Sequence, residues 1–138
     1  MIHAYDKNYL SKAQNNLASM FDFAVYDLNE DLSLFYQKFL QSKICPKFER
    51  GESTVIVGKS GVELALDVMK DESLASKYQP AANRSSEYWC GWALAYFQWY
   101  TKLSFKEINN YIPISEILAM YSPYHEMDLS QFFDKMIE

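Results

Sequence analysis

The apolar positions of the chain recur mostly at steps of three and four residues, the spacing of helices that bury one face. This spacing continues over residues 7–28, where Asp6 precedes the pattern as a candidate N-cap. The apolar positions of this stretch are Leu10, Ala13, Leu17, Met20, Ala24 and Leu28. The opposite face carries Lys12, Asn15, Ser19 and Asp22. We therefore predict a long amphipathic helix whose polar face meets solvent or a partner.

A different pattern distinguishes residues 88–101, which contain no charged side chain and seven aromatic ones. One stripe of this stretch is formed by Trp89, Trp92, Tyr96 and Trp99. Leu94 and Phe97 lie on other sides, so apolar groups surround the whole helix. Such a helix belongs inside a protein, and it is shorter than the about 20 apolar residues that cross a bilayer. We expect a central core helix over about residues 86–102, capped by Ser85 or Ser86.

Further helices are predicted from local start and stop signals. A second helix over residues 31–42 is expected to end close to Pro46, because the residue before a proline disfavours helical geometry. Other starts are marked by a capping residue placed three positions before Glu or Gln. Ser60, Ser104 and Asp128 have this spacing and predict helices at 61–70, at 104–110 and from Asp128 onward. Pro113 marks the start of a further helix at 114–121.

Two stretches fit more than one structure. Residues 47–59 place Gly51 and Gly58 around four apolar or β-branched residues, which suits either an extended segment or a loop. Residues 72–78 fit a short helix within a polar connection. Together the patterns predict an all-α protein with a single domain over residues 1–138, built as a bundle of five to seven helices around the aromatic helix.

Composition and charge narrow the classes of function. The 138-residue chain has a formal charge of −5, and neither half of it is basic. This argues against electrostatic binding of nucleic acid or of an anionic membrane. The N-terminal residues lack the basic and apolar regions of a secretory signal. Cys45 and Cys90 lack the spacing of a metal or redox motif, so we expect reduced, buried thiols in a cytoplasmic protein.

The string GKSG at residues 58–61 resembles the end of a phosphate-binding loop. The full motif requires a glycine where Ser53 stands, so it is absent. Lys59 and Ser60 could still hold an anion at the free amides of a helix start. The alternative, which we favour, is a glycine turn followed by a helix cap.

A second polar cluster consists of Tyr124, His125 and Glu126, shortly before Asp128. A zinc site needs three or four ligands, and the only other histidine of the chain is His3. We therefore predict no metal and no cofactor. The cluster is interpreted as the surroundings of a helix cap and as a candidate contact patch for a protein partner.

Residues 103–121 have the outline of a helix-turn-helix, which makes a DNA-binding regulator the main alternative function. Over residues 101–121, Lys102 and Lys106 are balanced by Glu107 and Glu116, and the second helix carries no basic residue. Because DNA binders bring cations to the phosphates, nucleic-acid binding is disfavoured. An enzyme is a weaker class again, since no nucleophile has a recognisable activating partner.

A resemblance to a known family is carried by stretches that cover most of the chain. They are YDKNYL, NNLASMFDFAV, GKSGVELA, EYWCGWALAYFQWY and YSPYHEMDLSQF. Through them the chain resembles a family of uncharacterised small cytoplasmic proteins from Gram-positive gut bacteria. Genes of this family often lie beside those for an ADP-ribosyltransferase-like protein and another small helical protein, an arrangement similar to toxin and antitoxin cassettes. The resemblance implies a neutralising or accessory role and brings no catalytic residue with it.

The function expected from these observations is a non-catalytic protein-binding module, antitoxin-like or accessory. Its partner is expected to be another bacterial protein encoded nearby, and self-association remains an alternative. Eleven tyrosines favour this class, because tyrosine can bury its ring in an interface while its hydroxyl stays hydrated. We expect some of four tyrosines to be exposed, with Tyr124 and His125 as the best contact patch. The four are Tyr26, Tyr78, Tyr121 and Tyr124.

Overall fold

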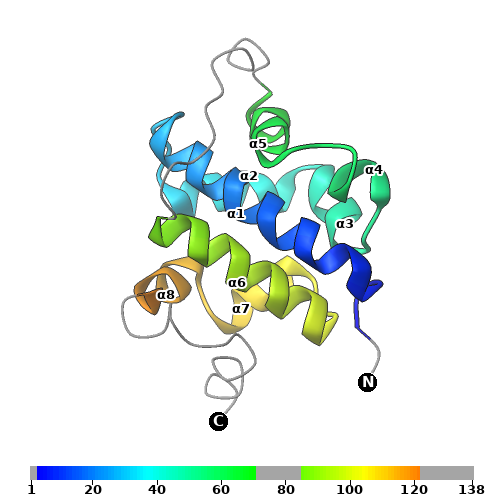
Figure 1. Cartoon of the computed structure of the whole chain (residues 1–138). Helices are drawn as coiled ribbons and strands as arrows, with labels where there is room; N and C mark the ends of the chain where they lie inside the picture. The colour runs from blue at the N-terminus through cyan, green and yellow to red at the C-terminus, as the bar shows by residue number, and fades with distance from the viewer. Residues whose placement is uncertain (1–2, 71–84, 122–138) are drawn as a thin grey trace.

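The computed structural model describes residues 3–70 and 85–121, and these residues form helices joined by short connections (Figure 1). No strand occurs in these two ranges, so the predicted all-α class is confirmed. The elements in order are η1 (Lys7–Tyr9), α1 (Leu10–Tyr26), α2 (Leu32–Gln41), α3 (Ile44–Glu49), α4 (Ser53–Ile56), α5 (Gly61–Met69), α6 (Ser86–Thr101), α7 (Phe105–Tyr111) and α8 (Ile114–Ala119).

The two longest helices, α1 and α6, lie side by side in the middle of the molecule (Figure 1). Their contact is close because Gly91 of α6 faces the backbone of α1: a Cβ atom at this position would lie 2.6 Å from the carbonyl oxygen of Leu17. The aromatic helix is therefore central, as its uncharged pattern predicts. Trp89 and Trp99 are buried, whereas Trp92 and Tyr96 are half-buried and pack against the core from outside.

On its other side in Figure 1, α1 is covered by α5. This contact also depends on a glycine, because a Cβ atom on Gly61 would lie 2.5 Å from the carbonyl oxygen of Asn16. With α5 and α6 both against it, α1 is buried more widely than an amphipathic pattern suggests. The expectation that Asp22 faces solvent is wrong, since its exposed fraction is only 9%.

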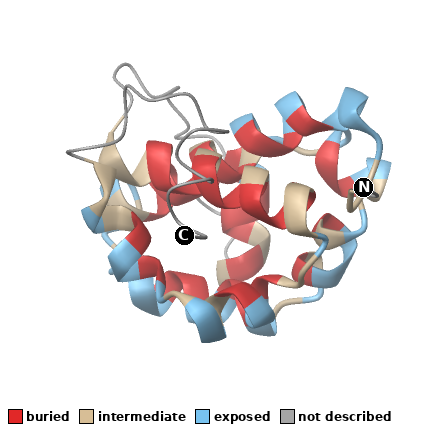
Figure 2. Ribbon diagram, turned by 90° about the horizontal axis from the view of Figure 1, so that it is seen from below, coloured by how far each residue is buried: buried red, intermediate tan, exposed pale blue. Residues whose placement is uncertain are grey.

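Helix α2 contributes aromatic side chains to the core, where they pack against the shorter helices α3 and α7. Phe35, Tyr36 and Phe39 are fully buried, and the ring of Phe39 lies 5.3 Å from that of Phe105 in α7. The same ring meets Phe48 of α3 edge-on at 6.4 Å. Figure 2 shows the buried segments on the inward sides of the helices and the exposed ones along the outer edges. Such edge-on aromatic pairs add stability beyond the area they bury.

Polar groups join α3, α6 and α7 at one point of the interior. The amide nitrogen of Gln98 donates to the carbonyl oxygens of Glu49 at 3.0 Å and Leu103 at 3.1 Å. The carboxylate of Glu49 accepts the backbone N–H of Phe105 at 2.6 Å, at the start of α7. These bonds satisfy backbone groups that the ends of short helices leave open.

The region 47–59, predicted as an extended segment or a loop, is in fact mostly helical. It holds the second half of α3 and all of α4, and these two short helices bring the α-helices of the described ranges to eight, against the five to seven expected. Pro46 does not end α2, which stops earlier at Gln41, but lies in the first turn of α3. Proline is tolerated there because its missing N–H would have had no partner within the helix.

Most other predicted starts are confirmed. Ser60 and Ser104 each form a capping box with the glutamate three residues on, and Ser85 caps α6. The first helix differs slightly, since residues 7–9 form a 3-10 turn and α1 proper begins at Leu10. The predicted short helix at 72–78 and the final helix from Asp128 lie outside the described residues. No helix within the described ranges is long and apolar enough to cross a membrane.

Candidate functional site

Of the sequence-predicted site residues, Lys59 and Ser60 lie in the described part of the chain. The hydroxyl of Ser60 accepts the N–H of Glu63 at 3.2 Å, and the carboxylate of Glu63 accepts the N–H of Ser60 at 3.2 Å. The side chain of Asn16 donates to the carbonyl oxygen of Lys59 at 3.0 Å. The segment thus caps α5 and attaches it to α1, which favours the helix-cap interpretation over an anion site.

Lys59 also has a partner for its charge. Its ammonium forms an ion pair with Asp67, which lies eight residues further along the chain, near the end of α5. The other predicted site residues, Tyr124, His125 and Glu126, lie outside the described residues. The described residues therefore contain one of the two predicted clusters, Lys59 and Ser60.

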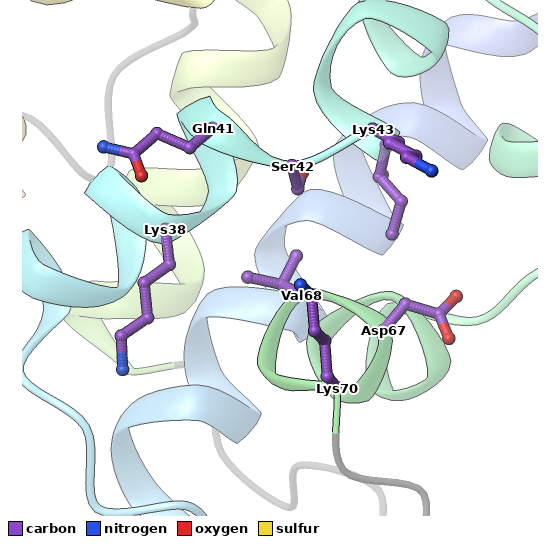
Figure 3. A pocket seen from close by; sticks show the side chains of 8 residues that line it. Lys38, Gln41, Ser42, Lys43, Asp67, Val68 and Lys70 are labelled. Carbon is purple, nitrogen blue, oxygen red and sulfur yellow. The ribbon is translucent and has the colours of Figure 1, made fainter.

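Asp67 also lines a pocket of about 540 Å³ between the C-terminal ends of α2 and α5 (Figure 3). Its volume lies within the range of small-molecule sites. In Figure 3, residues of α2 line one side and residues of α5 the other, with the α2–α3 connection above. The lining residues are Lys38, Gln41, Ser42, Lys43, Ile44, Asp67, Val68 and Lys70.

Two helix ends give this pocket its shape. At Ser42 the backbone becomes extended, and the Ser42 hydroxyl donates to the carbonyl oxygen of Phe39 at 2.7 Å while accepting the N–H of Cys45 at 3.4 Å. At the end of α5, Lys70 adopts the left-handed conformation with φ of 58°. The ends of two helices distant in sequence therefore face each other across the pocket.

Among the described residues, the lining of the pocket carries more positive than negative charge, although the protein as a whole is acidic. It contains three lysines and one aspartate, and that aspartate is already neutralised by Lys59. Lys38 is paired with Glu30 at 2.8 Å. Lys43 and Lys70 form no ion pair with any described residue. The described lining therefore carries unpaired positive charge. It also includes two apolar side chains, Ile44 of α3 and Val68 of α5.

A separate cluster of titratable groups lies where the start of α6 meets the end of α1. Ser85 donates to the Asp22 carboxylate at 2.5 Å, and Tyr26 donates to Glu87 at 2.7 Å. Burial raises the pKa of Asp22, and the hydrogen bond from Ser85 opposes that rise. The hydrogen bond to Glu87, followed by burial, raises the pKa of Tyr26 to about 12.

The groups of this cluster serve the fold. The Ser85 hydroxyl also accepts the N–H of Tyr88 at 3.0 Å, so both its donor and an acceptor position are occupied by protein groups. Asp22 in turn holds that capping serine in place. The described residues contain no group of histidine, cysteine, aspartate and glutamate with metal-binding proximity.

Both cysteines are buried, and burial is the main cause that raises the pKa of each thiol well above its usual range. Cys45 additionally lies 3.5 Å from the Glu49 carboxylate, whose charge disfavours a thiolate. Since the thiolate is the reactive form, neither cysteine is suited to nucleophilic chemistry in the folded protein.

The helix pair α7 and α8 is built for packing. Phe105 and Ile108 of α7 and Ile114 and Ile117 of α8 are buried. Helix α8 has six residues and lies against both α6 and α2. Its exposed side offers Glu116 and no cation, an arrangement that would repel the phosphates of DNA.

The last candidate feature is the set of tyrosine side chains that are exposed to solvent. Tyr26 is 56% exposed, which confirms that at least one of the four named tyrosines is accessible. Tyr121 is half-buried, with its ring 5.9 Å from that of Trp89. The most exposed aromatic residue of the described ranges is Tyr111, at 82%, at the end of α7. Sequence reasoning missed Tyr111 and all the pocket lysines.

Comparisons of the chain with protein-family models, with curated proteins and with solved structures gave no match.

Proposed function

We propose that the protein is a non-catalytic, cytoplasmic protein-binding module. The observation that carries the proposal is the exposure of Tyr111, an 82% accessible aromatic ring at the end of a short helix whose other apolar residues are buried. Tyrosine is enriched among the residues that dominate the binding energy of protein interfaces. A partner that covers this ring would remove a large apolar surface from water.

The chemistry of the described interior supports a binding role over a catalytic one. Of the site residues predicted from the sequence, the two that are described have structural roles: Ser60 caps α5 and Lys59 forms an ion pair. Ser85 likewise caps α6. Both thiols are buried. An enzyme site requires a nucleophile or base that is accessible to substrate and activated by a neighbour, and these groups do not meet that requirement.

The partner that fits the sequence resemblance is another bacterial protein encoded nearby. In that arrangement this protein acts as an antitoxin-like or accessory component. A second copy of the same chain is the competing occupant of the Tyr111 surface.

Co-expression with the products of the flanking genes tests the proposal. A tagged chain is expected to capture one of these products, and a Tyr111→Ser variant is expected to lose most of that capture. Tyr9→Ser is the matched control, because Tyr9 is only 36% exposed and lies on η1, a different element from α7. Deletion of the gene should make the captured neighbour inhibit growth if the role is neutralising.

Two results would oppose the proposal. One is capture of no flanking product together with a purely monomeric sedimentation profile. The other is equal capture by the parent and the Tyr111→Ser variant, which would move the interface away from α7.

A further inference from the structure

We propose that the pocket between the ends of α2 and α5 binds a small organic phosphate, independently of the protein-binding role. The phosphate group would lie between Lys43 and Lys70, and the organic part would rest against Ile44 and Val68. Lys43 and Ile44 lie at the start of α3, Val68 and Lys70 lie at the end of α5, and all four line one cavity.

Two of the three lysines that line the pocket form no ion pair with the described residues. Lys38 and Lys59 are held by Glu30 and Asp67, whereas Lys43 and Lys70 form no ion pair with the described residues. Both line the pocket, and the one carboxylate among its described lining residues, that of Asp67, is already paired with Lys59. In a protein with a formal charge of −5, a hollow with two spare ammonium groups selects a doubly negative ligand. A phosphate monoester has that charge near neutral pH.

The size and lining of the pocket argue for an organic phosphate over the bare ion. A volume of about 540 Å³ is far larger than a phosphate group needs and lies in the range of drug-sized ligands. Ile44 and Val68 supply apolar contact for a ring or chain, and Gln41 offers an amide that can donate and accept. The hydroxyl of Ser42 is occupied by the backbone and plays no part.

The backbone at Lys70 makes glycine a suitable replacement there. This residue ends α5 with φ of 58°, a conformation that glycine adopts at helix ends without strain. A Lys70→Gly change therefore removes the ammonium group without straining the backbone. Lys102 ends α6 in the same conformation, with φ of 63°, but does not line the pocket. The two lysines form a natural pair of test and control positions.

Lysines at helix ends also interact favourably with the helix dipole, and this role competes with the proposed one. The two roles predict different results. A purely structural Lys70 contributes to stability and leaves ligand binding unchanged on replacement. A phosphate-binding Lys70 affects the affinity for ligand, whatever its effect on stability.

The experiment measures binding of adenosine 5′-monophosphate, glucose 6-phosphate and inorganic phosphate to the full chain by isothermal titration calorimetry. Adenosine and glucose serve as the matched neutral ligands. We expect a dissociation constant below about 1 mM for at least one organic phosphate. The corresponding neutral compound and inorganic phosphate should bind at least about tenfold more weakly, because a charge-assisted hydrogen bond or the apolar contact is lost.

The variants are Lys43→Gln, Lys70→Gln and Lys70→Gly, with Lys102→Gly and Lys106→Gln as controls outside the pocket. Each pocket variant should weaken binding about tenfold or more, as expected for a lost charge-assisted contact, and the controls should bind like the parent. In spectra of the parent protein, the methyl signals of Ile44 and Val68 should shift on titration with the ligand. These methyl signals test binding at the pocket even if a pocket variant fails to fold.

Three results would overturn the proposal. The first is that none of the phosphates binds below about 1 mM. The second is that the control variants weaken phosphate binding as much as the pocket variants do, which would show a general attraction of phosphate to surface lysines. The third is binding of inorganic phosphate as tightly as the organic esters, which would show an adventitious ion only.

Discussion

Gly91 of α6 lies so close to Leu17 of α1 that a Cβ atom would come within 2.6 Å of the Leu17 carbonyl oxygen. The same Cβ atom would lie 2.8 Å from the Cα atom of Ala18. The two central helices therefore meet backbone to backbone at this point. A side chain at position 91 would have to push them apart, since rigid backbone atoms cannot yield as a flexible side chain can.

We expect Gly91→Ala to lower the free energy of unfolding by about 1 to 3 kcal/mol, the usual cost of overpacking a core. This loss should occur although alanine favours a helix over glycine by about 1 kcal/mol. Urea denaturation followed by circular dichroism measures the change. Gly91→Val should cost more than Gly91→Ala, and an unchanged midpoint for either variant would contradict the close packing of α1 and α6.

The Asp22 carboxylate gives a prediction about pH. Burial raises the pKa of Asp22, so the folded protein holds this proton more tightly than the unfolded chain does. The contribution of Asp22 to stability then falls as the pH rises from the ordinary aspartate pKa through the raised one. The amide introduced by Asp22→Asn would carry no such charge, and its carbonyl oxygen can still accept the hydrogen bond from Ser85.

Asp22→Asn is therefore expected to match the parent in acid and to become the more stable protein towards neutral pH. Thermal melts between pH 3 and pH 7, about the interval over which a carboxyl of raised pKa titrates, measure the difference. Glu116→Gln, at an exposed position of α8, provides the control and should show little change. A stability gain that is the same at every pH would show that charge burial is not its cause.

The buried thiols give a third prediction. Cys45 and Cys90 should resist alkylation and disulfide exchange in the native state, because burial disfavours their thiolates and blocks access. Both should react quickly in denaturing urea. Mass spectrometry after brief iodoacetamide treatment counts the modified residues, and rapid native labelling of Cys90 would contradict its place in the core.

Local signals predicted the parts of this fold that are themselves local. The caps at Ser60, Ser85 and Ser104 depend on hydrogen bonds within three residues, so the sequence alone contains the whole interaction. The aromatic helix was predictable for a similar reason: its uncharged surface can be accommodated only in an interior. Residues 47–59 were not, because helices as short as α3 and α4 are stabilised by tertiary packing more than by propensity.

The candidate sites show where sequence patterns stop being informative. Tyr111 follows the buried Ile108 by three residues, a helical spacing that predicts burial, but α7 ends there and Ile112 packs inward instead. The pocket joins Lys38 and Lys43 to Lys70 across a distance in sequence that no motif spans. Both features come from how the elements meet, and only the three-dimensional arrangement contains that information.

The central claim is that Tyr111 forms part of a protein interface, and the affinity of a captured partner for the parent and for Tyr111→Ala tests it most directly. Because Tyr111 is 82% exposed, the substitution should change stability by no more than about 0.5 kcal/mol. Binding measured by calorimetry should weaken at least about tenfold, the effect of a tyrosine hot spot. An affinity that is unchanged by Tyr111→Ala, in a variant with an unchanged melting temperature, would contradict the account.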